Sequence, residues 1–202
     1  LASGGSFYYH ARLSLSGVAP AVGPERGGTR VVVLGDGFRD AYTLRCAFGA
    51  ASAPVLARLV DDAQLECSSA VHAPGGVAVR LSMNGQQYTG AGSSVGGADG
   101  GGAGGIGVWY TYQVAAAVID VVPSSALSEG GTPLTVYGGG FSSVSESLGV
   151  LTCRTGGAVR RARWASESGV ACNATRLASG SSRLGVSNNA REYASGGARL
   201  RV

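Results

Sequence analysis

Apolar and polar residues alternate along this chain in short runs that glycine or proline interrupts. Val31 and Val33 stand two residues apart in one run, and Leu134 and Val136 do so in another. Because successive side chains of a β-strand point to opposite faces, we expect these four residues to face a core. The same alternation predicts inward positions at Val77, Val79, Leu81, Met83, Leu184 and Val186. No stretch of helical length has an apolar period of 3.6 residues between capping residues, so the pattern predicts an all-β protein.

One stretch of the sequence occurs twice. GGTRVVVLGDGF at 27–38 returns as GGTPLTVYGGGF at 130–141, an offset of 103 residues, and a proline (Pro20 or Pro123) precedes each copy at the same distance. Paired glycines before a strand supply the positive φ of a turn, and we expect the Phe after each Gly-x-Gly to fill a core. A period of this length matches a small domain, so the repeat predicts two tandem β-sandwiches.

The repeat also sets the expected domain limits. We expect the first sandwich at 16–114 and the second at 115–202, and residues 1–15 should be the last strand of a preceding module, because FYYHARLSLSGVAP mirrors WYTYQVAAAVIDVVP. The glycine-rich segment 89–107 is too poor in side chains to bury apolar surface, so it is expected to be a mobile loop inserted in the first copy. The stretch 112–125 is short and apolar, which predicts domains packed end to end with limited swing.

Composition narrows the function classes. Apolar residues make up 45% of the chain, which is enough for packed cores. No apolar run approaches the roughly 18 residues of a membrane span, so this segment is expected to make no direct membrane insertion. The formal net charge of +4 is modest, and all 16 basic residues are arginines scattered along the sequence. This distribution is not typical of a nucleic-acid-binding protein, and we expect no nucleic-acid partner.

The chain offers few groups for catalysis or for binding a cofactor. It has 12 Asp and Glu and two His, and it has no Gly-x-Ser-x-Gly nucleophile motif. Asp61 and Asp62 lack the further ligands of a calcium loop, so a solvated turn is expected there. No helix follows the glycine-rich segment, which therefore lacks the helix N-terminus of a phosphate site. The sequence predicts a non-enzymatic protein with no catalytic, cofactor or metal site.

The four cysteines are placed two in each copy. Cys46 and Cys67 lie 21 residues apart, and Cys153 and Cys172 lie 19 apart. Four cysteines allow three pairings, and equivalent positions in the two copies favour pairing within each copy. Zinc binding is the competing hypothesis, but no Cys-x-x-Cys pair exists and both histidines are distant in sequence. Disulfides would place the chain in an oxidising, secretory compartment.

Two further motifs suggest surface chemistry. Asn173 begins the Asn-x-Ser/Thr triplet NAT directly after Cys172, and we expect it to be an N-glycosylation site on a surface turn. Arg160, Arg161 and Arg163 form a cluster that could grip an acidic glycan or a carboxylate-rich protein by bidentate hydrogen bonds. The alternative is a solvated edge strand whose charges prevent edge-to-edge pairing. The two tryptophans, Trp109 and Trp164, are expected in the core or at the junction.

The ordered set of features resembles the IPT/TIG domain family. In the first copy the set comprises the proline, the glycine pair with Thr, the alternating apolar run, Gly-x-Gly-Phe, CAFG at 46–49, a second cysteine, an Asn-containing turn and the closing WYTY at 109–112. The second copy departs from it, because CRTG at 153–156 lacks the Phe and no aromatic pair closes the copy. The resemblance implies immunoglobulin-like sandwiches. Such domains occur in extracellular parts of plexin-like receptors and very large fibrocystin-like surface proteins, and in intracellular transcription factors that use them for dimerisation and DNA contact.

The cysteines, the glycosylation motif and the tandem repeat favour the extracellular branch of the family. We expect a structural and adhesive segment of a large extracellular or cell-surface glycoprotein, a spacer and protein-interaction array. Its partners would be other protein chains, including neighbouring repeats or copies of itself, or an acidic glycan. It could belong to a surface filament such as a ciliary appendage, or to a receptor ectodomain that binds a protein or glycan. A transcription-factor-type dimerisation module is the alternative from another class, and it predicts free thiols.

Overall fold

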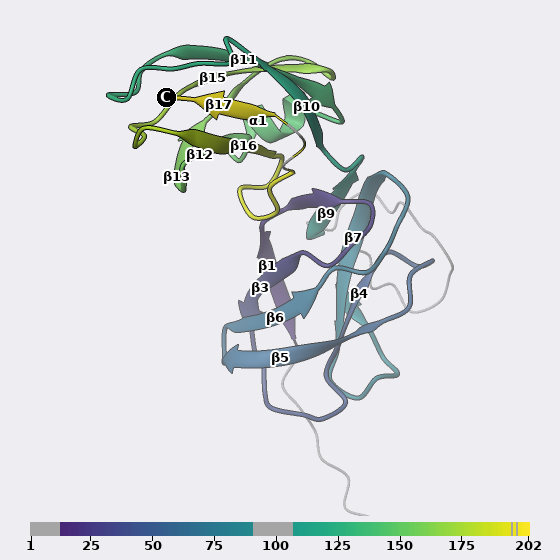
Figure 1. Cartoon of the computed structure of the whole chain (residues 1–202). Helices are drawn as coiled ribbons and strands as arrows, with labels where there is room; N and C mark the ends of the chain where they lie inside the picture. Colours follow the sequence, from purple (N-terminus) through teal and green to yellow (C-terminus); the bar gives the residue numbers. More distant parts are fainter. Residues whose placement is uncertain (1–12, 91–106, 195, 197) are drawn as a thin grey trace, which may run out of the picture.

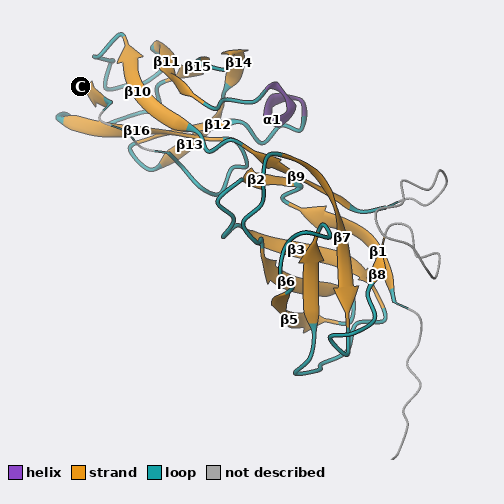
Figure 2. Ribbon diagram, turned by 90° about the vertical axis from the view of Figure 1, so that its right-hand side faces the viewer, coloured by secondary structure: helices purple, strands orange, loops and turns teal. Residues whose placement is uncertain are grey.

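The computed structural model describes residues 13–90, 107–194, 196 and 198–202. These residues form two β-sandwiches joined end to end (Figure 1). Strands dominate both, and the described residues include a single short helix (Figure 2). None of the described helices has the length and apolar character needed to cross a membrane. The predicted fold class, all-β with two tandem sandwiches, is confirmed.

The first sandwich is a rolled sheet with the order β1-β3-β6-β5-β4-β7-β9-β2, with β8 added beside β7. Its strands are β1 (Ser14–Ala19), β2 (Val22–Pro24), β3 (Arg30–Asp36), β4 (Arg45–Phe48), β5 (Val55–Asp61), β6 (Gln64–Ser68), β7 (Gly75–Ser82), β8 (Thr89–Gly90) and β9 (Trp109–Gln113). The start of β5 pairs with β4 and the rest with β6, so this strand passes from one layer to the other. β2 runs parallel to β9, and the other pairs are antiparallel.

The second sandwich repeats this topology with two separate sheets, β10-β11-β15-β14 and β13-β12-β16-β17. Its elements are β10 (Ala117–Val122), β11 (Pro133–Gly139), α1 (Ser143–Ser147), β12 (Thr152–Thr155), β13 (Ala158–Arg161), β14 (Arg163–Ser166), β15 (Gly169–Asn173), β16 (Ser181–Ser187) and β17 (Arg199–Arg201). The continuous β5 of the first sandwich corresponds to β13 and β14, which are separated at Ala162. A parallel bridge between Ser125 and Arg201 stands where β2 meets β9.

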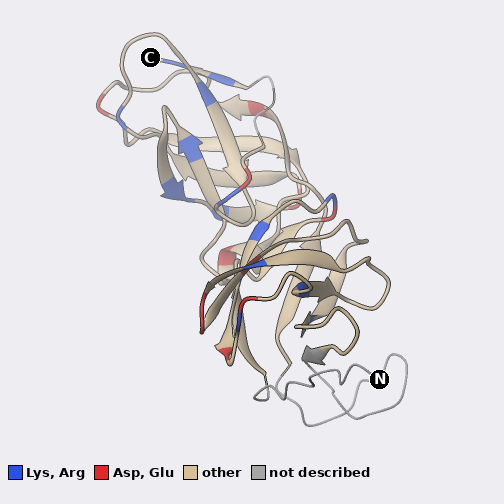
Figure 3. Ribbon diagram, turned by 90° about the horizontal axis from the view of Figure 1, so that it is seen from below, with Lys and Arg blue, Asp and Glu red and all other residues tan. Residues whose placement is uncertain are grey.

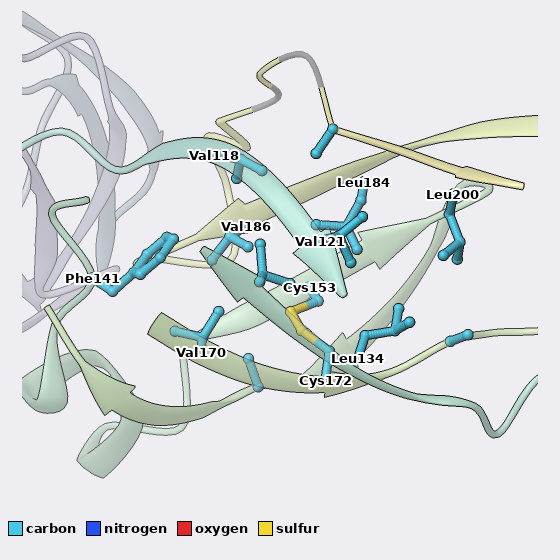
Figure 4. Packing of buried hydrophobic residues seen from close by; sticks show 14 of the residues in the cluster. Val118, Val121, Leu134, Phe141, Cys153, Val170, Cys172, Leu184, Val186 and Leu200 are labelled. Carbon is cyan, nitrogen blue, oxygen red and sulfur yellow. A yellow bond between two sulfur atoms is a disulfide. The ribbon is translucent and has the colours of Figure 1, made fainter. Parts of the chain in front are cut away.

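Each sandwich encloses its own apolar core, as the alternating pattern predicts. Val31, Val33, Leu134 and Val136 are all 0–2% exposed. Phe38 and Phe141, which follow the Gly-x-Gly turns, are each 2% exposed. The other inward positions are also buried at Val77, Val79, Leu81, Leu184 and Val186, while Met83 is partly buried against the first core. The second core is shown in Figure 4.

Both sandwiches are closed by a disulfide between their layers. Cys46 on β4 is bonded to Cys67 on β6, and Cys153 on β12 is bonded to Cys172 on β15. The Cα atoms are 6.4 Å apart in each pair, and all four sulfurs lie inside the cores. Figure 4 shows the second disulfide among the valines and leucines of its core. The structure therefore has the within-copy pairing that the equivalent positions favour.

Several features differ from the expectation or lie beyond it. The five-residue helix α1 was not anticipated, because one helical turn is too short to show a 3.6-residue period. Trp109 is 58% exposed rather than buried, whereas Trp164 is partly buried against the second core. Of the segment 1–15, residues 1–12 lie outside the described residues, and Ser14 and Leu15 begin β1, which pairs with β3. The preceding module stays a prediction. The predicted mobile loop 89–107 cannot be tested at 91–106, which also lie outside the described residues.

Candidate functional site

One face of the second sandwich is strongly basic. In the sheet β13-β12-β16-β17 the side chains that point inward include Cys153, Leu184, Val186 and Leu200, so their neighbours along each strand point to solvent. The outward positions hold arginines, whereas Arg160 pairs with Cys153 and so lies on the inner side of the edge strand β13. We call this outward set the basic face: Arg154, Arg161, Arg183, Arg199 and Arg201, all exposed. The four strands contain no Asp or Glu, and the blue strands of Figure 3 show how arginine gathers on this sandwich.

The guanidinium group of Arg154 is held in place on this face. It lies over the Tyr193 ring, 4.3 Å from the ring centroid. The Tyr193 hydroxyl is 2.9 Å from the Thr152 hydroxyl, and this hydrogen bond fixes the ring. A cation over an aromatic face is stabilised electrostatically while its N–H groups stay free to bind a ligand. Arg154 is therefore oriented at the centre of the face.

The predicted arginine cluster is divided by the structure. We expected Arg161 and Arg163 to project from one face of a strand, with Arg160 near a turn or on the opposite side, but β13 ends at Arg161, Ala162 is buried, and Arg163 begins β14 in the other sheet. The reason is that the chain changes sheets at Ala162, as β5 does without a break in the first sandwich. Sequence reasoning missed Arg154, Arg183, Arg199 and Arg201. The alternation in SRLGVS and ARLRV was the available signal, because it places arginine at outward positions.

The junction between the sandwiches is polar at two points, although the connecting stretch 112–125 is itself mostly apolar. At the first point, Gln113 at the end of β9 enters the second sandwich beside α1. Its Nε2 donates to the Ser142 hydroxyl at 2.9 Å, and the Ser145 hydroxyl donates to its Oε1 at 2.9 Å. Gln113 is 9% exposed and Ser145 is fully buried. The short helix thus positions a buried hydroxyl against the neighbouring sandwich.

The second point of the junction joins Thr29 to the turn after β16. The Thr29 hydroxyl donates to Oε2 of Glu192 at 3.1 Å, and Asn189 Nδ2 donates to the same carboxylate oxygen. Asn189 is itself fixed, because its Oδ1 accepts hydrogen bonds from the Ser187 hydroxyl and from the backbone N–H of Glu192. Two hydrogen-bonded contacts, one to the buried Ser145 and one to the buried Thr29, therefore connect the sandwiches.

A groove with a volume of about 340 Å³ lies beside the first contact. Val114, Ser142, Ser143, Trp164 and Glu167 line it. The indole Nε1 of Trp164 donates to the Phe141 carbonyl at 3.2 Å, and this hydrogen bond fixes the tryptophan in the wall of the groove. Trp164 thus lies at the junction, one of the two places predicted for it. The groove holds one carboxylate and no second titratable group.

The closing WYTY segment of the first sandwich builds an aromatic cluster in its core. The rings of Tyr110 and Tyr112 meet edge to face at 4.9 Å, Phe48 lies 5.2 Å from Tyr110, and His72 stacks on Tyr112 at 5.0 Å. Burial raises the pKa of both tyrosine hydroxyls above the ordinary value. In the second sandwich the place of Tyr110 is taken by Leu200. The cluster is therefore packing peculiar to the first sandwich.

Asn173 lies at the end of β15 with its side chain exposed. It pairs with Pro133 on β11, while the next pair, Leu134 and Cys172, faces the core. Asn173 therefore points outward from the sheet β10-β11-β15-β14, on the side of the sandwich away from the basic face. A glycan there would extend into solvent.

The described part of the chain contains no group of three or more His, Cys, Asp or Glu side chains close enough to hold a metal ion. Asp61 accepts a hydrogen bond from the Ala63 N–H at 2.9 Å in the turn between β5 and β6. The two ion pairs among the described residues both involve Glu66, whose carboxylate lies between Arg30 and Arg58 on the outer face of the first sandwich. The hydrogen bond from Arg30 lowers the pKa of Glu66.

Comparison with known structures places the fold. The extracellular region of plexin A4, domains 1 to 10, superposes with a TM-score of 0.51 and 18% sequence identity over 89% of this chain, which spans 15% of that plexin chain. A second plexin A4 structure gives a TM-score of 0.45 and 15% identity over 94% of this chain and 18% of that one. Invasin, a bacterial integrin-binding protein, gives 0.31 and 10% identity over 95% of this chain and 41% of its own. No curated protein matches the sequence.

The family comparison is more specific than the superpositions. The sequence model of the IPT/TIG domain matches twice, at residues 13–95 and 117–200. Each match contains one of the two disulfides and one copy of the Gly-x-Gly-Phe turn. Because the two matches together cover well over half of the sequence, this chain belongs to the IPT/TIG domain family.

Proposed function

We propose that this segment is a non-enzymatic spacer and protein-interaction array in a large extracellular or cell-surface glycoprotein. The observation that carries the proposal is the junction, where Gln113 bonds to the buried Ser145 and Glu192 to the buried Thr29 between two separately cored sandwiches. We infer that breaking these hydrogen bonds would leave buried hydroxyls without partners, so they hold successive modules at a fixed angle, which a spacer requires. The module limits that we propose are 16–114 and 115–202, with 1–15 closing a preceding module.

The extracellular location is supported by the two disulfides. Buried disulfides form and persist in oxidising compartments and are rare in cytosolic proteins. A transcription-factor-type module would keep its thiols reduced, so mass analysis with and without a reductant separates the two classes. Within the extracellular class, a repeat of a filament such as a ciliary appendage and a repeat of a receptor ectodomain remain two forms of the same proposal. The length of the whole array and its anchor would distinguish them.

The junction gives the first test of the spacer function. In the wild-type chain we expect the two sandwiches to tumble as one body, and in a Q113A/E192A chain we expect them to tumble separately. Removing Gln113 leaves the buried Ser145 hydroxyl without its partner, at a cost of about 1–3 kcal/mol to the junction. The measurement is ¹⁵N relaxation, which gives one rotational correlation time for each sandwich. Q86A, which alters an exposed turn far from the junction, should behave as wild type. Separate tumbling in the wild-type chain would contradict the proposal.

Glycosylation of Asn173 gives a second test. When the chain is expressed through a secretory pathway, we expect one N-glycan, because Asn173 is exposed and its sheet face is open. Asn173→Gln should remove the glycan mass, as measured by intact mass before and after enzymatic deglycosylation. Asn84→Gln provides the control, since Asn84 is followed by Gly-Gln and forms no acceptor triplet. A secreted wild-type chain without added mass would remove the glycoprotein part of the proposal.

A further inference from the structure

The basic face is separated from the acidic residues of the chain. Nine of the 16 arginines but only five of the 12 Asp and Glu lie beyond residue 114. Glu192, adjacent to Tyr193, is turned toward Thr29 and is used in the junction. Both ion pairs among the described residues belong to Glu66 in the first sandwich, so the arginines of the basic face make none. Their guanidinium groups are free to bind an anion.

The first sandwich shows that the fold does not require these arginines. The disulfide cysteines fix the correspondence, because Cys46 pairs with Leu81 across β4 and β7 as Cys153 pairs with Val186 across β12 and β16. Counting from these pairs, each arginine of the basic face has an uncharged equivalent in the first sandwich. The equivalents are Ala47 for Arg154, Leu56 for Arg161, Ala78 for Arg183, Trp109 for Arg199 and Thr111 for Arg201.

One pair of arginines is expected to destabilise the sheet. Arg183 on β16 and Arg199 on β17 are direct cross-strand partners. Like charges directly opposite each other destabilise an antiparallel pair. The first sandwich avoids this repulsion with Ala78 and Trp109 at the same two positions. An anion bound between Arg183 and Arg199 would remove the repulsion, which is the reason to expect a ligand here.

The chemistry of the face favours a polyanion of extended shape over a protein. Protein interfaces depend on buried aromatic and apolar anchors at their centre. The only large apolar side chain exposed on the described part of these four strands is Val159, and the one aromatic ring beside them, Tyr193, lies beneath Arg154. The face is instead four strands, or about 14 Å, wide and carries donors across its whole width.

We propose that the basic face binds a linear polysaccharide that carries sulfate or carboxylate groups. Arginine presents paired N–H groups that match the oxygens of such anions, and successive groups along one polymer can reach arginines on neighbouring strands. The choice of a polysaccharide rather than a nucleic acid rests on the extracellular location proposed above. Asn173 projects from the opposite sheet, so a glycan attached there leaves the basic face open.

The test uses the 202-residue chain and a size-fractionated heparin fragment as the sulfated probe. The variant R154A/R183A/R201T introduces the residues that the first sandwich carries at these positions, so it should keep the unfolding midpoint of wild type. We expect its affinity for heparin to fall about tenfold or more at low salt, and the slope of log K against log[salt] to become less steep by roughly three. The control R39A/R163A/R176A removes the same formal charge from exposed arginines outside the basic face and should bind nearly as wild type.

The following results would overturn the proposal. The first is that wild type does not bind heparin at low salt. The second and third are that the control R39A/R163A/R176A weakens heparin binding as much as R154A/R183A/R201T does, or that R154A/R183A/R201T binds heparin as wild type does. The fourth is that wild type binds a DNA duplex of similar charge as tightly as heparin or more tightly, which would make the ligand a nucleic acid. Binding of neutral dextran in place of heparin would also exclude a charge-based site. Heparin binding by the basic face does not depend on the geometry of the junction. The binding test can therefore fail while the two sandwiches still tumble as one body. Equally, the sandwiches can tumble separately while heparin still binds.

Discussion

A G138A chain is expected to lose about 3 kcal/mol of unfolding free energy, near the upper end of the cost of overpacking a buried site. Gly138 is in β11 opposite Val118 of β10, and a Cβ at this position would lie 1.9 Å from the Ala117 carbonyl oxygen and 2.8 Å from Cζ of Phe141. The first contact is with backbone, so a rotamer change cannot relieve it. The strands must separate, which also displaces the buried Phe141. Denaturant unfolding of the second sandwich measures the loss.

The neighbouring glycine is the matched control for this prediction. A Cβ on Gly139 would meet no atom within 4 Å, and the equivalent position of the first sandwich is Asp36, so the fold accepts a side chain there. G139A should therefore be neutral or slightly stabilising, because Ala restricts the unfolded chain more than Gly. G35A should repeat the loss in the first sandwich, where the added Cβ would lie 2.0 Å from the Ser14 carbonyl oxygen. Equal effects of G138A and G139A would contradict the explanation.

The core and the turns of this fold could be predicted from sequence because their signals are periodic and local. Val31 and Val33 alternate with less buried residues, and the Gly27-Gly28 turn has the positive φ values, 69° and 83°, that its composition predicts. The repeat then doubled each signal, since Gly130 and Gly131 have φ values of 84° and 81°. Two copies of one pattern indicated two separate cores, and the structure has two.

The junction could not be predicted from the sequence, and the exposed tryptophan was wrongly predicted although its strand alternation was available. Gln113 and Ser145 are ordinary polar residues, and only the position of one sandwich against the other buries them. Trp109 was expected in the core or at the junction, but its strand alternates so that Tyr110 and Tyr112 are buried and Trp109 faces solvent. The alternation of β9 was the better guide than the residue type.

The basic face shows how a surface site is distributed across the sequence. Arg154, Arg161, Arg183 and Arg199 come from four strands, and only the sheet order brings them together. The sequence cluster at 160–163 contributed part of the face and included Arg163, which lies on the other sheet. A cluster of charged residues in the sequence thus predicts the charge of a sheet surface poorly. Comparing the outward strand positions of the two repeats predicts it better.

Replacing both cysteines of one sandwich is expected to destabilise that sandwich by about 3 kcal/mol in the chain-entropy account, since each disulfide closes a loop of roughly 20 residues. C153A/C172A should therefore lower the unfolding midpoint of the second sandwich, and C46A/C67A that of the first. The sulfur atoms are also buried in each core, so the alanines leave unfilled space that adds to the loss. In a small domain this is a large share of the net stability.

The two tryptophans allow each sandwich to be followed separately. Trp109 is the only tryptophan of the first sandwich and Trp164 of the second, so fluorescence of a W109F chain reports the second sandwich and that of a W164F chain the first. In W109F, C153A/C172A should shift the denaturant midpoint strongly, while C46A/C67A should shift it little, because the two cores share no residue. The W164F chain should give the reverse order. If either pair of replacements lowered both midpoints equally, the sandwiches would be one cooperative unit, and the hydrogen bonds of Gln113 and Glu192 would couple their folding as well as their orientation.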